Sequence, residues 1–349
     1  MKHKKGAESV GKDEPMKKYF AAFLLLTLCL TGCKAKETAA PSTPSDVPIQ
    51  TPTIEADAFY TAYKNAEKRP VAVMVDNDNK DAWPHAGLSD AYLIYEVPVE
   101  GGATRLMALF NEQTTDKIGP VRSSRHYFLD YVLEHDAIYT HFGYSPRAMA
   151  DIPALGVNNI NGVLGSDSGA FWRETKYVGD YHSAFTSMEK INKMVEKKDY
   201  RTEREKAPLL FAETEKTLEG TPAADITIPY SGGYRSGFLY NAETGTYAKY
   251  MNGSIHALQG GKSLAVKNII IMTVKSYPLG DGSARINIDT VGSGKGQYIT
   301  MGQAVPITWE KSSRSGKTTW KDASGAEIAL NPGQTFVMLV PNTVSVSVK

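Results

Sequence analysis

The chain has 349 residues, with 39 lysines and arginines against 38 aspartates and glutamates. A charge this close to balance argues against a strongly basic protein whose main partner is nucleic acid. It has only two cysteines, Cys29 and Cys33, so the fold must be held by its hydrophobic core, and we expect no metal site and no cofactor.

The N-terminus has the pattern of an export signal. Lys17 and Lys18 precede an apolar run over residues 19–30, and Thr31-Gly32-Cys33 follows it. This run is too short for a membrane-spanning helix, which needs roughly 20 apolar residues. The ending Leu-x-Gly-Cys looks like a bacterial lipobox, which predicts cleavage between Gly32 and Cys33 and attachment of a lipid to Cys33. Acyl chains would then anchor the protein to the membrane.

Changes in composition divide the chain into six segments. Met16 is a more natural start for the signal than Met1, so the first residues are interpreted as an upstream extension. The predicted segments are the extension (1–15), a lipoprotein signal peptide (16–32), the lipidated cysteine with a disordered tether (33–65), an N-terminal α/β domain (66–205), a connection (206–221) and a C-terminal β domain (222–349).

Helical and strand patterns alternate in the N-terminal domain. The predicted helices cover residues 56–68, 123–134, a segment that begins at Ser145-Pro146, and 188–198, the last with a capping box at Thr186 to Glu189. The predicted strands cover 71–75, ending in a turn at Asp76-Asn77, then 92–99, 104–110 and 137–142. Gly101-Gly102 predicts a hairpin, and Pro98 predicts a sheet edge or a bulge.

The C-terminal domain shows short strand-like runs separated by turns and no helical period. The runs cover residues 226–230, 238–240, 268–274, 285–289, 305–309 and 336–340. This pattern predicts an all-β sandwich or barrel, so the fold class is α+β. The stretch 292–296 lacks the spacing of a phosphate-binding loop and is interpreted as a flexible hairpin. Tyr298, Trp309 and Trp320 fit either a sugar-binding platform or, more commonly, core residues.

Charged and polar residues gather at the ends of the predicted strands of the first domain. The candidate ligand-binding residues are Asp76, Asn77, Glu96, Glu100, Arg105, Arg122, Arg125, His141, Ser145 and His182. Arg122 and Arg125 are expected to flank the start of a helix, where an anion is favoured. The alternative is that the arginines form structural bridges to Glu96 and Glu100.

Two catalytic interpretations are weaker. Gly143-Tyr144-Ser145 follows a strand as a nucleophile elbow does, but Arg147 stands where that motif needs glycine, and Ser145 is explained as a helix cap. His141 is the best single candidate for acid–base chemistry, although a hydrogen-bonded, half-buried histidine is the more common case. The histidines lack metal-ligand spacing.

Several motifs resemble the YerB-like lipoproteins of Gram-positive bacteria, a two-domain family of unknown function. They are Val73-x-Val75-Asp76-Asn77, Gly87-Leu88-Ser89-x-Ala91, residues 95–105, residues 118–125, Asn268 to Ile271, residues 288–294 and residues 331–337. One departure is Tyr181-His182-Ser183, where such proteins tend to carry Pro-His-Asn. The resemblance implies a lipoprotein with two domains and no established activity.

Together these features favour a binding module over an enzyme. We expect a lipid-anchored protein on the extracytoplasmic face of the membrane, whose Glu/Arg cluster recognises an anionic or wall-derived ligand. A hydrolase or transferase on cell-wall polymer is the first alternative, and an assembly partner of another envelope protein is the second.

Overall fold

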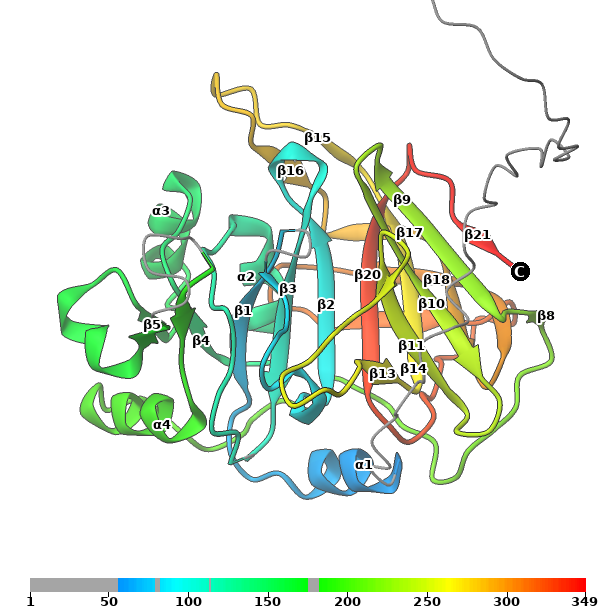
Figure 1. Cartoon of the computed structure of the whole chain (residues 1–349), viewed down its shortest axis with the longest axis horizontal. Coiled ribbons are helices and arrows are strands. Elements are labelled where there is room, and N and C mark those ends of the chain that lie inside the picture. Colours follow the sequence, from blue (N-terminus) through cyan, green and yellow to red (C-terminus); the bar gives the residue numbers. More distant parts are fainter. Residues whose placement is uncertain (1–55, 79–81, 113, 175–181) are drawn as a thin grey trace, which may run out of the picture. The chain divides into compact units, whose positions relative to one another are not determined.

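The computed structural model describes residues 56–349 except 79–81, 113 and 175–181 (Figure 1). The predicted signal peptide, Cys33 and residues 34–55 of the predicted tether lie outside the described residues, whereas residues 56–65 of that segment form a helix. Within the described part of the chain, no helix is both long and apolar enough to cross a membrane.

The N-terminal segment alternates helices and strands as its sequence predicts. Its elements are α1 (Ala56–Asn65), β1 (Val71–Asn77), β2 (Leu93–Pro98), β3 (Thr104–Phe110), α2 (Leu129–Glu134), β4 (Ile138–His141), α3 (Pro146–Ala154), β5 (Asn159–Asn161), β6 (Trp172–Arg173), β7 (Ala184–Phe185) and α4 (Met188–Lys197). Short 3-10 turns, η3 (Leu88–Asp90), η4 (Glu100–Gly102), η5 (His126–Phe128) and η6 (Gly165–Ala170), connect several of them.

The C-terminal segment is built from strands. They are β8 (Thr221–Pro222), β9 (Asp225–Ser231), β10 (Tyr234–Asn241), β11 (Thr246–Met251), β12 (Ser254–Ile255), β13 (Ala265–Val266), β14 (Asn268–Val274), β15 (Ser276–Pro278), β16 (Ile286–Ile288), β17 (Gly292–Thr300), β18 (Gln303–Lys311), β19 (Thr318–Lys321), β20 (Thr335–Pro341) and β21 (Ser347–Val348). The predicted fold class, a mixed α/β segment followed by a β segment, is confirmed.

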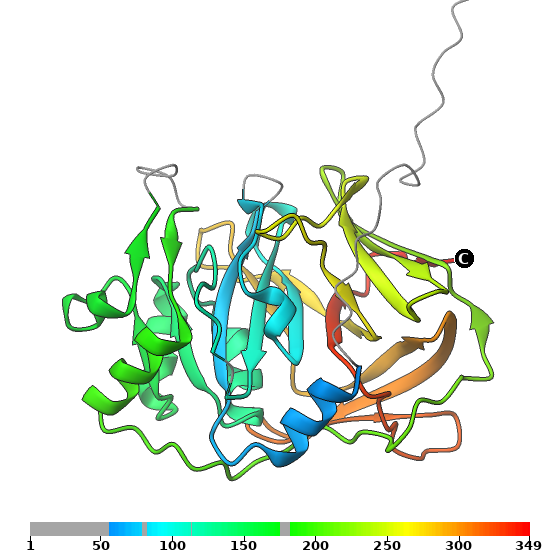
Figure 2. The same cartoon turned by 60° about the horizontal axis from the view of Figure 1, so that its bottom comes forward.

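One large mixed sheet contains strands of both segments, in the order β19-β18-β17-β14-β20-β2-β3-β1-β4-β5 (Figure 1). The two segments meet where β2 pairs with β20 in parallel, with Ile94 opposite Phe336. Because β1 and β4 are also parallel to each other, the carboxyl ends of β1, β2, β4 and β20 point to the same edge. Figure 2 shows α1 at the opposite end of these strands.

Each face of the large sheet packs against its own core. On one face Val73 and Ile94 belong to a core shared with Ile226 and Phe238 of the second sheet, which is formed around β9, β10 and β11. On the other face Met74 packs in a core with residues of α2 and the preceding turn. Alternate residues of β1, β2 and β3 therefore enter different cores, as the two-residue period of a strand requires.

Two predictions about these strands were wrong. Asp76 and Asn77 are not a turn but the last two residues of β1, still paired with Arg105 and Thr104 of β3. Nor does β2 lie at an edge, since it runs between β20 and β3. Pro98 is tolerated because β20 pairs only with residues 93–96, so the missing N–H interrupts no bond to that neighbour.

The start of the predicted helix at 123–134 was also wrong. Residues 122–125 are extended, because Arg122 donates its N–H to the Met74 carbonyl at 2.9 Å and Ser124 donates to Gly143 at 2.9 Å. The helical turns begin only at His126. In α4 the cap is Ser187, which accepts the Lys190 N–H at 3.3 Å, instead of Thr186, whose hydroxyl donates to the Ala170 carbonyl.

Residues 292–296 form part of β17 and are not a flexible hairpin. This strand pairs with β14 on one side and β18 on the other. A Cβ atom on Gly294 would collide with the Trp309 ring, and one on Gly296 would collide with the Ile271 carbonyl. The glycines are therefore explained by close approach of neighbouring groups. Tyr298, Trp309 and Trp320 are buried core residues.

Candidate functional site

Polar residues at the end of β1 and the start of β3 face two different environments. Asp76 and Arg105 lie on the α2 side of the sheet, and Asn77 and Thr104 lie on the side of the second sheet. The first pair contributes to an open pocket, and the second pair belongs to a buried network between the sheets, although Thr104 also lines the pocket.

The pocket, which we call the arginine pocket, has a volume of about 230 Å³. It is lined by Asp76, Asp78, Val99, Glu100, Ala103, Thr104, Arg105, Arg122, Ser123 and Arg125. These residues come from the end of β1, the β2–β3 hairpin and the extended segment before α2. Three guanidinium groups thus line one cavity.

Arg105 differs from the other two arginines. Its side chain is buried, and its Nη1 donates to the Ser123 carbonyl at 2.6 Å. Its Nε has no hydrogen-bond partner, and no carboxylate among the described residues lies within ion-pair distance. Burial lowers the pKa of Arg105 to about 10, and the charges of Arg125 and Arg122 act in the same direction, while the nearby charge of Asp76 opposes the shift. The group is still a cation at neutral pH.

Asp76 joins Arg122 to His182. Its Oδ2 lies 3.1 Å from Nε of Arg122 and 2.8 Å from Nδ1 of His182, and its side chain is only 1% exposed. Burial alone would raise the pKa of Asp76, but the hydrogen bond from His182 and the charges of Arg122 and Arg105 outweigh burial and lower this pKa. The carboxyl group is therefore ionised.

Arg125 and Glu100 form a two-pronged pair across the mouth of the pocket. Nε of Arg125 donates to Oε2 of Glu100 at 3.0 Å, and Nη2 contacts Oε1. Partial burial would raise the pKa of Glu100, but the bonds and charge of Arg125 lower it to about 2. This pair is a structural bridge as well as a part of the lining.

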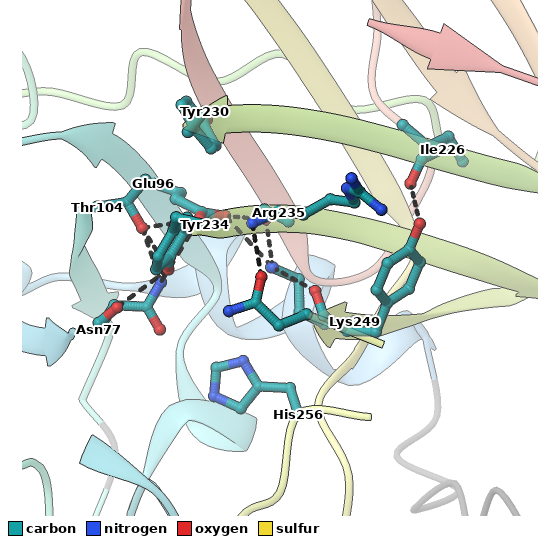
Figure 3. Close-up of polar contacts among 12 residues, drawn as sticks. Asn77, Glu96, Thr104, Ile226, Tyr230, Tyr234, Arg235, Lys249 and His256 are labelled. Atoms are coloured by element: carbon teal, nitrogen blue, oxygen red, sulfur yellow. Dashed lines mark hydrogen bonds and ion pairs between the residues drawn. The ribbon is translucent and has the colours of Figure 1, made fainter. Parts of the chain in front are cut away.

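Figure 3 shows the buried network, which we call the interlayer network and define by Asn77, Glu96, Thr104, Tyr234, Ser236 and Lys249. Glu96 accepts from the hydroxyls of Thr104 at 2.8 Å and Ser236 at 2.9 Å, and it lies 3.4 Å from Nζ of Lys249. Burial lowers the pKa of Lys249, and Glu96 opposes that shift. The network ties β1, β2 and β3 to the second sheet.

Two buried histidines, His85 and His256, form a chain of contacts that ends at the backbone carbonyl of Asp76. His85 contacts the Asp76 carbonyl through Nε2 at 2.5 Å and Nε2 of His256 through Nδ1 at 2.5 Å. Burial lowers the pKa of His85 to about 4 and that of His256 well below its usual value. Both rings are therefore neutral, and because a carbonyl can only accept, His85 donates from Nε2 and accepts from His256.

Comparisons with known proteins agree over both segments. Residues 59–201 match the model "Protein of unknown function (DUF3048) N-terminal domain", and residues 226–337 match the corresponding C-terminal domain. The chain belongs to the DUF3048 family. A protein named "Putative lipoprotein YerB" from Bacillus subtilis (strain 168) is 30% identical over 347 residues, which is 95% of this chain and 98% of that protein. The crystal structure of YerB from Bacillus subtilis superposes with a TM-score of 0.72, covering 81% of this chain and 95% of that one at 30% identity.

Three of the sequence stretches that suggested this family, residues 73–77, 95–105 and 118–125, contribute residues to the two polar regions. Of the ten predicted binding residues, five line the arginine pocket, namely Asp76, Glu100, Arg105, Arg122 and Arg125. His182 joins them through Asp76. Asn77 and Glu96 lie in the interlayer network instead, and Glu96 pairs with Lys249 and not with an arginine. The helical turns begin at His126, directly after Arg125 as expected, whereas Arg122 lies further back in the extended segment.

His141 and Ser145 do not belong to the pocket. His141 is fully buried, with Nδ1 against the Gly143 carbonyl at 2.8 Å and Nε2 against Asn159 at 3.2 Å, and burial lowers its pKa to about 4. Ser145 caps α3 by accepting the Ala148 N–H at 3.3 Å. Both residues have the structural roles that were weighed against catalysis.

Sequence reasoning missed several members of the two regions. Asp78, Thr104 and Ser123 line the pocket, and each directly adjoins a residue that was predicted. Lys249 and Ser236 had no signal of this kind, because the strand of Lys249 was not predicted, the strand of Ser236 was predicted only in part, and their partners are distant in sequence. Within the described residues, no group of three or more His, Cys, Asp or Glu could hold a metal ion.

Proposed function

We propose that the chain is a lipoprotein held by Cys33 on the extracytoplasmic face of the membrane, and that its arginine pocket binds an anionic ligand of the cell envelope. The signal pattern of residues 17–33 supports the address, and the name of the Bacillus subtilis relative agrees with it. The geometry of the pocket supports the ligand class.

The unmatched charge of Arg105 is the observation that carries the ligand proposal. Arg122 and Arg125 each have a carboxylate in contact, whereas Arg105 has only a carbonyl. Burial of an ion costs several kcal/mol, and for Arg105 the Ser123 carbonyl and the nearby charge of Asp76 oppose that cost without an ion pair. An anion in the pocket would supply the missing partner, and guanidinium groups suit carboxylate and phosphate.

The ligand proposal is tested by binding of the full-length chain, in detergent, to purified cell-wall sacculi and, by calorimetry, to inorganic phosphate. Arg105→Met should lower retention and affinity by roughly 10- to 100-fold, the value of one or two charge-assisted hydrogen bonds. Arg235→Ala is the matched control, because this exposed arginine on β10 lies outside the pocket. Equal binding by wild type and Arg105→Met would refute the assignment.

The address is tested separately. Cys33→Ala should release the protein from the membrane fraction, because an exported chain without acyl chains keeps no stable anchor. Cell fractionation and the mass of the mature N-terminal peptide measure this. A Cys33→Ala protein that remains with the membranes as firmly as wild type would contradict lipid anchoring.

A further inference from the structure

The charged side chains that line the arginine pocket are balanced in number. Three are arginines and three are carboxylates, namely Asp76, Asp78, Glu100, Arg105, Arg122 and Arg125. The formal charges of the lining therefore sum to zero. A simple anion would leave the filled pocket with a net negative charge, whereas a ligand with one charge of each sign would leave it neutral. The balance favours a ligand that has both an anionic and a cationic group.

The two signs of charge differ in their access to solvent. Arg105, which lies in β3 opposite Asp76, is only 5% exposed. Glu100 belongs to the turn η4 between β2 and β3, and its side chain is 30% exposed. Asp78, directly after β1, is also exposed. The cation that lacks a carboxylate contact is thus buried, and two of the carboxylates reach the solvent. This arrangement orients a ligand with its anionic group inward and its cationic group outward.

Glu100 keeps acceptor capacity although it is paired with Arg125. A carboxylate offers about four acceptor positions on its two oxygens. Arg125 donates to both oxygens through Nε and Nη2, and the N–H of Glu100 itself is a further donor, so about one position is left for a ligand. Burial acts to raise the pKa of Glu100, but the bonds and charge of Arg125 lower it to about 2. The group is therefore an anion at neutral pH and can accept from an ammonium group.

The size of the pocket limits the ligand. Its volume of about 230 Å³ is smaller than that of sites that enclose drug-sized molecules, which is roughly 300 to 1,000 Å³. The part of a ligand that enters is therefore small, and its two charged groups are separated by only a few bonds. Aminoalkyl phosphates and amino acids have this composition.

We infer that the arginine pocket binds a small zwitterion, with its anionic group against Arg105 and its primary ammonium group against Glu100. The inference rests on the proposed function, because it specifies the ligand class of the same site. Arg105 supplies affinity for the anion, and Glu100 selects ligands that also carry an amine. Phosphate and carboxylate both suit a guanidinium group, so the feature that defines the ligand is the ammonium group a few bonds from the anion.

The test compares pairs of probes that differ only in the ammonium group. Calorimetry on the full-length chain in detergent measures O-phosphoethanolamine against ethyl phosphate, and β-alanine against propionate. Wild type should bind the amine of at least one pair roughly 10-fold more tightly than the matching anion, the value of one hydrogen bond to a charged group at a partly exposed position. The pair that shows this difference identifies the anionic group as phosphate or carboxylate.

Two substitutions separate the two ends of the ligand. Glu100→Gln should bring the affinity ratio of the amine to the plain anion close to one, because the amide has no charge. Arg125, once released from Glu100, strengthens binding of the plain anion and acts in the same direction. Arg105→Met should weaken both members of a pair by a similar factor and leave their ratio unchanged. Glu243→Gln is the matched control, because this exposed glutamate between β10 and β11 lies outside the pocket.

The remaining outcomes distinguish this inference from the proposed function. Equal binding of both members of each pair by wild type overturns the inference and leaves the proposed function standing. A preference for the amine that Glu100→Gln does not reduce also overturns the inference. Absence of binding of all four probes overturns it as well, and if inorganic phosphate and sacculi also fail to bind, the proposed function falls with it. If circular dichroism shows Glu100→Gln to be unfolded, the wild-type comparison decides, because it needs no variant.

Discussion

The arginine pocket and the interlayer network contain neighbouring residues of the same strands, but they differ in the partners of their buried charges. Asp76 and Arg105 belong to the pocket and Asn77 belongs to the network, whereas Thr104 bonds within the network and also lines the pocket. In the network the buried Glu96 has two hydroxyl donors and the Lys249 ammonium, whereas the buried Arg105 of the pocket has one carbonyl and no carboxylate. Burial of a charge is common to both regions, and they differ in whether an opposite charge is in contact with the buried group.

Strand alternation explains why neighbouring residues of β1 and β3 contribute mainly to different regions. The second sheet covers one face of β1, β2 and β3 and supplies Tyr234, Ser236 and Lys249 as partners. At the same strand ends, the other face opens into the pocket. A one-residue slip of β1 against β3 would exchange these environments, which indicates how strongly the register is specified.

The largest expected effect is a loss of folding stability at acidic pH, which tests whether the buried histidines are neutral. Burial lowers the pKa of His85 and His141 to about 4 and that of His135 to about 3, against 6.5 in the unfolded chain. Between these values the unfolded chain binds more protons than the folded one, so the free energy of unfolding falls as pH drops from 6.5 towards 4. Urea denaturation across this range measures the fall. A flat profile would show that the histidines are not neutral in the folded protein.

Removal of the network cation should have the largest effect of any single substitution. Lys249→Met leaves Glu96 buried without a counter-charge and should lower the free energy of unfolding by about 3 to 5 kcal/mol. Adding Glu96→Gln should restore part of this loss, because the uncompensated charge is then gone. Denaturant titrations of the single and double variants measure both effects. A loss below about 1 kcal/mol for Lys249→Met would mean that Glu96 is not truly excluded from water.

Replacing the buried cation of the pocket by methionine should not destabilise the protein as the Lys249 substitution does. Arg105→Met removes a buried charge that has no carboxylate partner, so the free energy of unfolding should stay level or rise by about 1 kcal/mol. Its thermal unfolding, compared with wild type in the absence of ligand, provides the measurement. A clear loss of stability would place Arg105 with the network residues, as a structural group.

A smaller loss of stability is expected for Ser145, which caps α3 and does not line the pocket. Ser145→Ala should lower the free energy of unfolding by about 1 kcal/mol, the usual value of an N-cap. Anion binding should not change, because Ser145 does not line the pocket. Unfolding and calorimetry on the same preparation distinguish the two roles. Weakened binding at unchanged stability would revive the nucleophile interpretation of Ser145.

Sequence reasoning was most successful where the cause was local. The glycines at 101–102 and the cap at Ser145 are determined by their immediate neighbours, and the structure has both as predicted. Five of the pocket residues were predicted because Asp76, Glu100 and Arg105 lie at the ends of apolar strands, and Arg122 and Arg125 lie before an expected helix. The helix start at 123 was wrong because the N–H groups of residues 122 and 124 bond to distant segments.

The partners of Glu96 show the limit more clearly. Lys249 lies in a strand of ordinary composition, and no local pattern marks it as a buried cation. Its role depends on the packing of the second sheet against the first, which brings together residues far apart in the chain. Pairings of that kind are set by tertiary structure, so a prediction from one sequence has no information with which to make them.

The parallel pairing of β2 with β20 constrains the order in which the protein can be completed. Residues 93–96 leave the ribosome early, and their partners at 335–338 are among the last to be made. Until then β2 presents an unpaired edge of backbone N–H and C=O groups, which is a template for pairing with other chains. Contacts this distant also make folding slow. The N-terminal half is therefore the part of the chain that is most prone to aggregate before synthesis is complete. In a truncated chain that lacks β20, the edge of β2 stays unpaired.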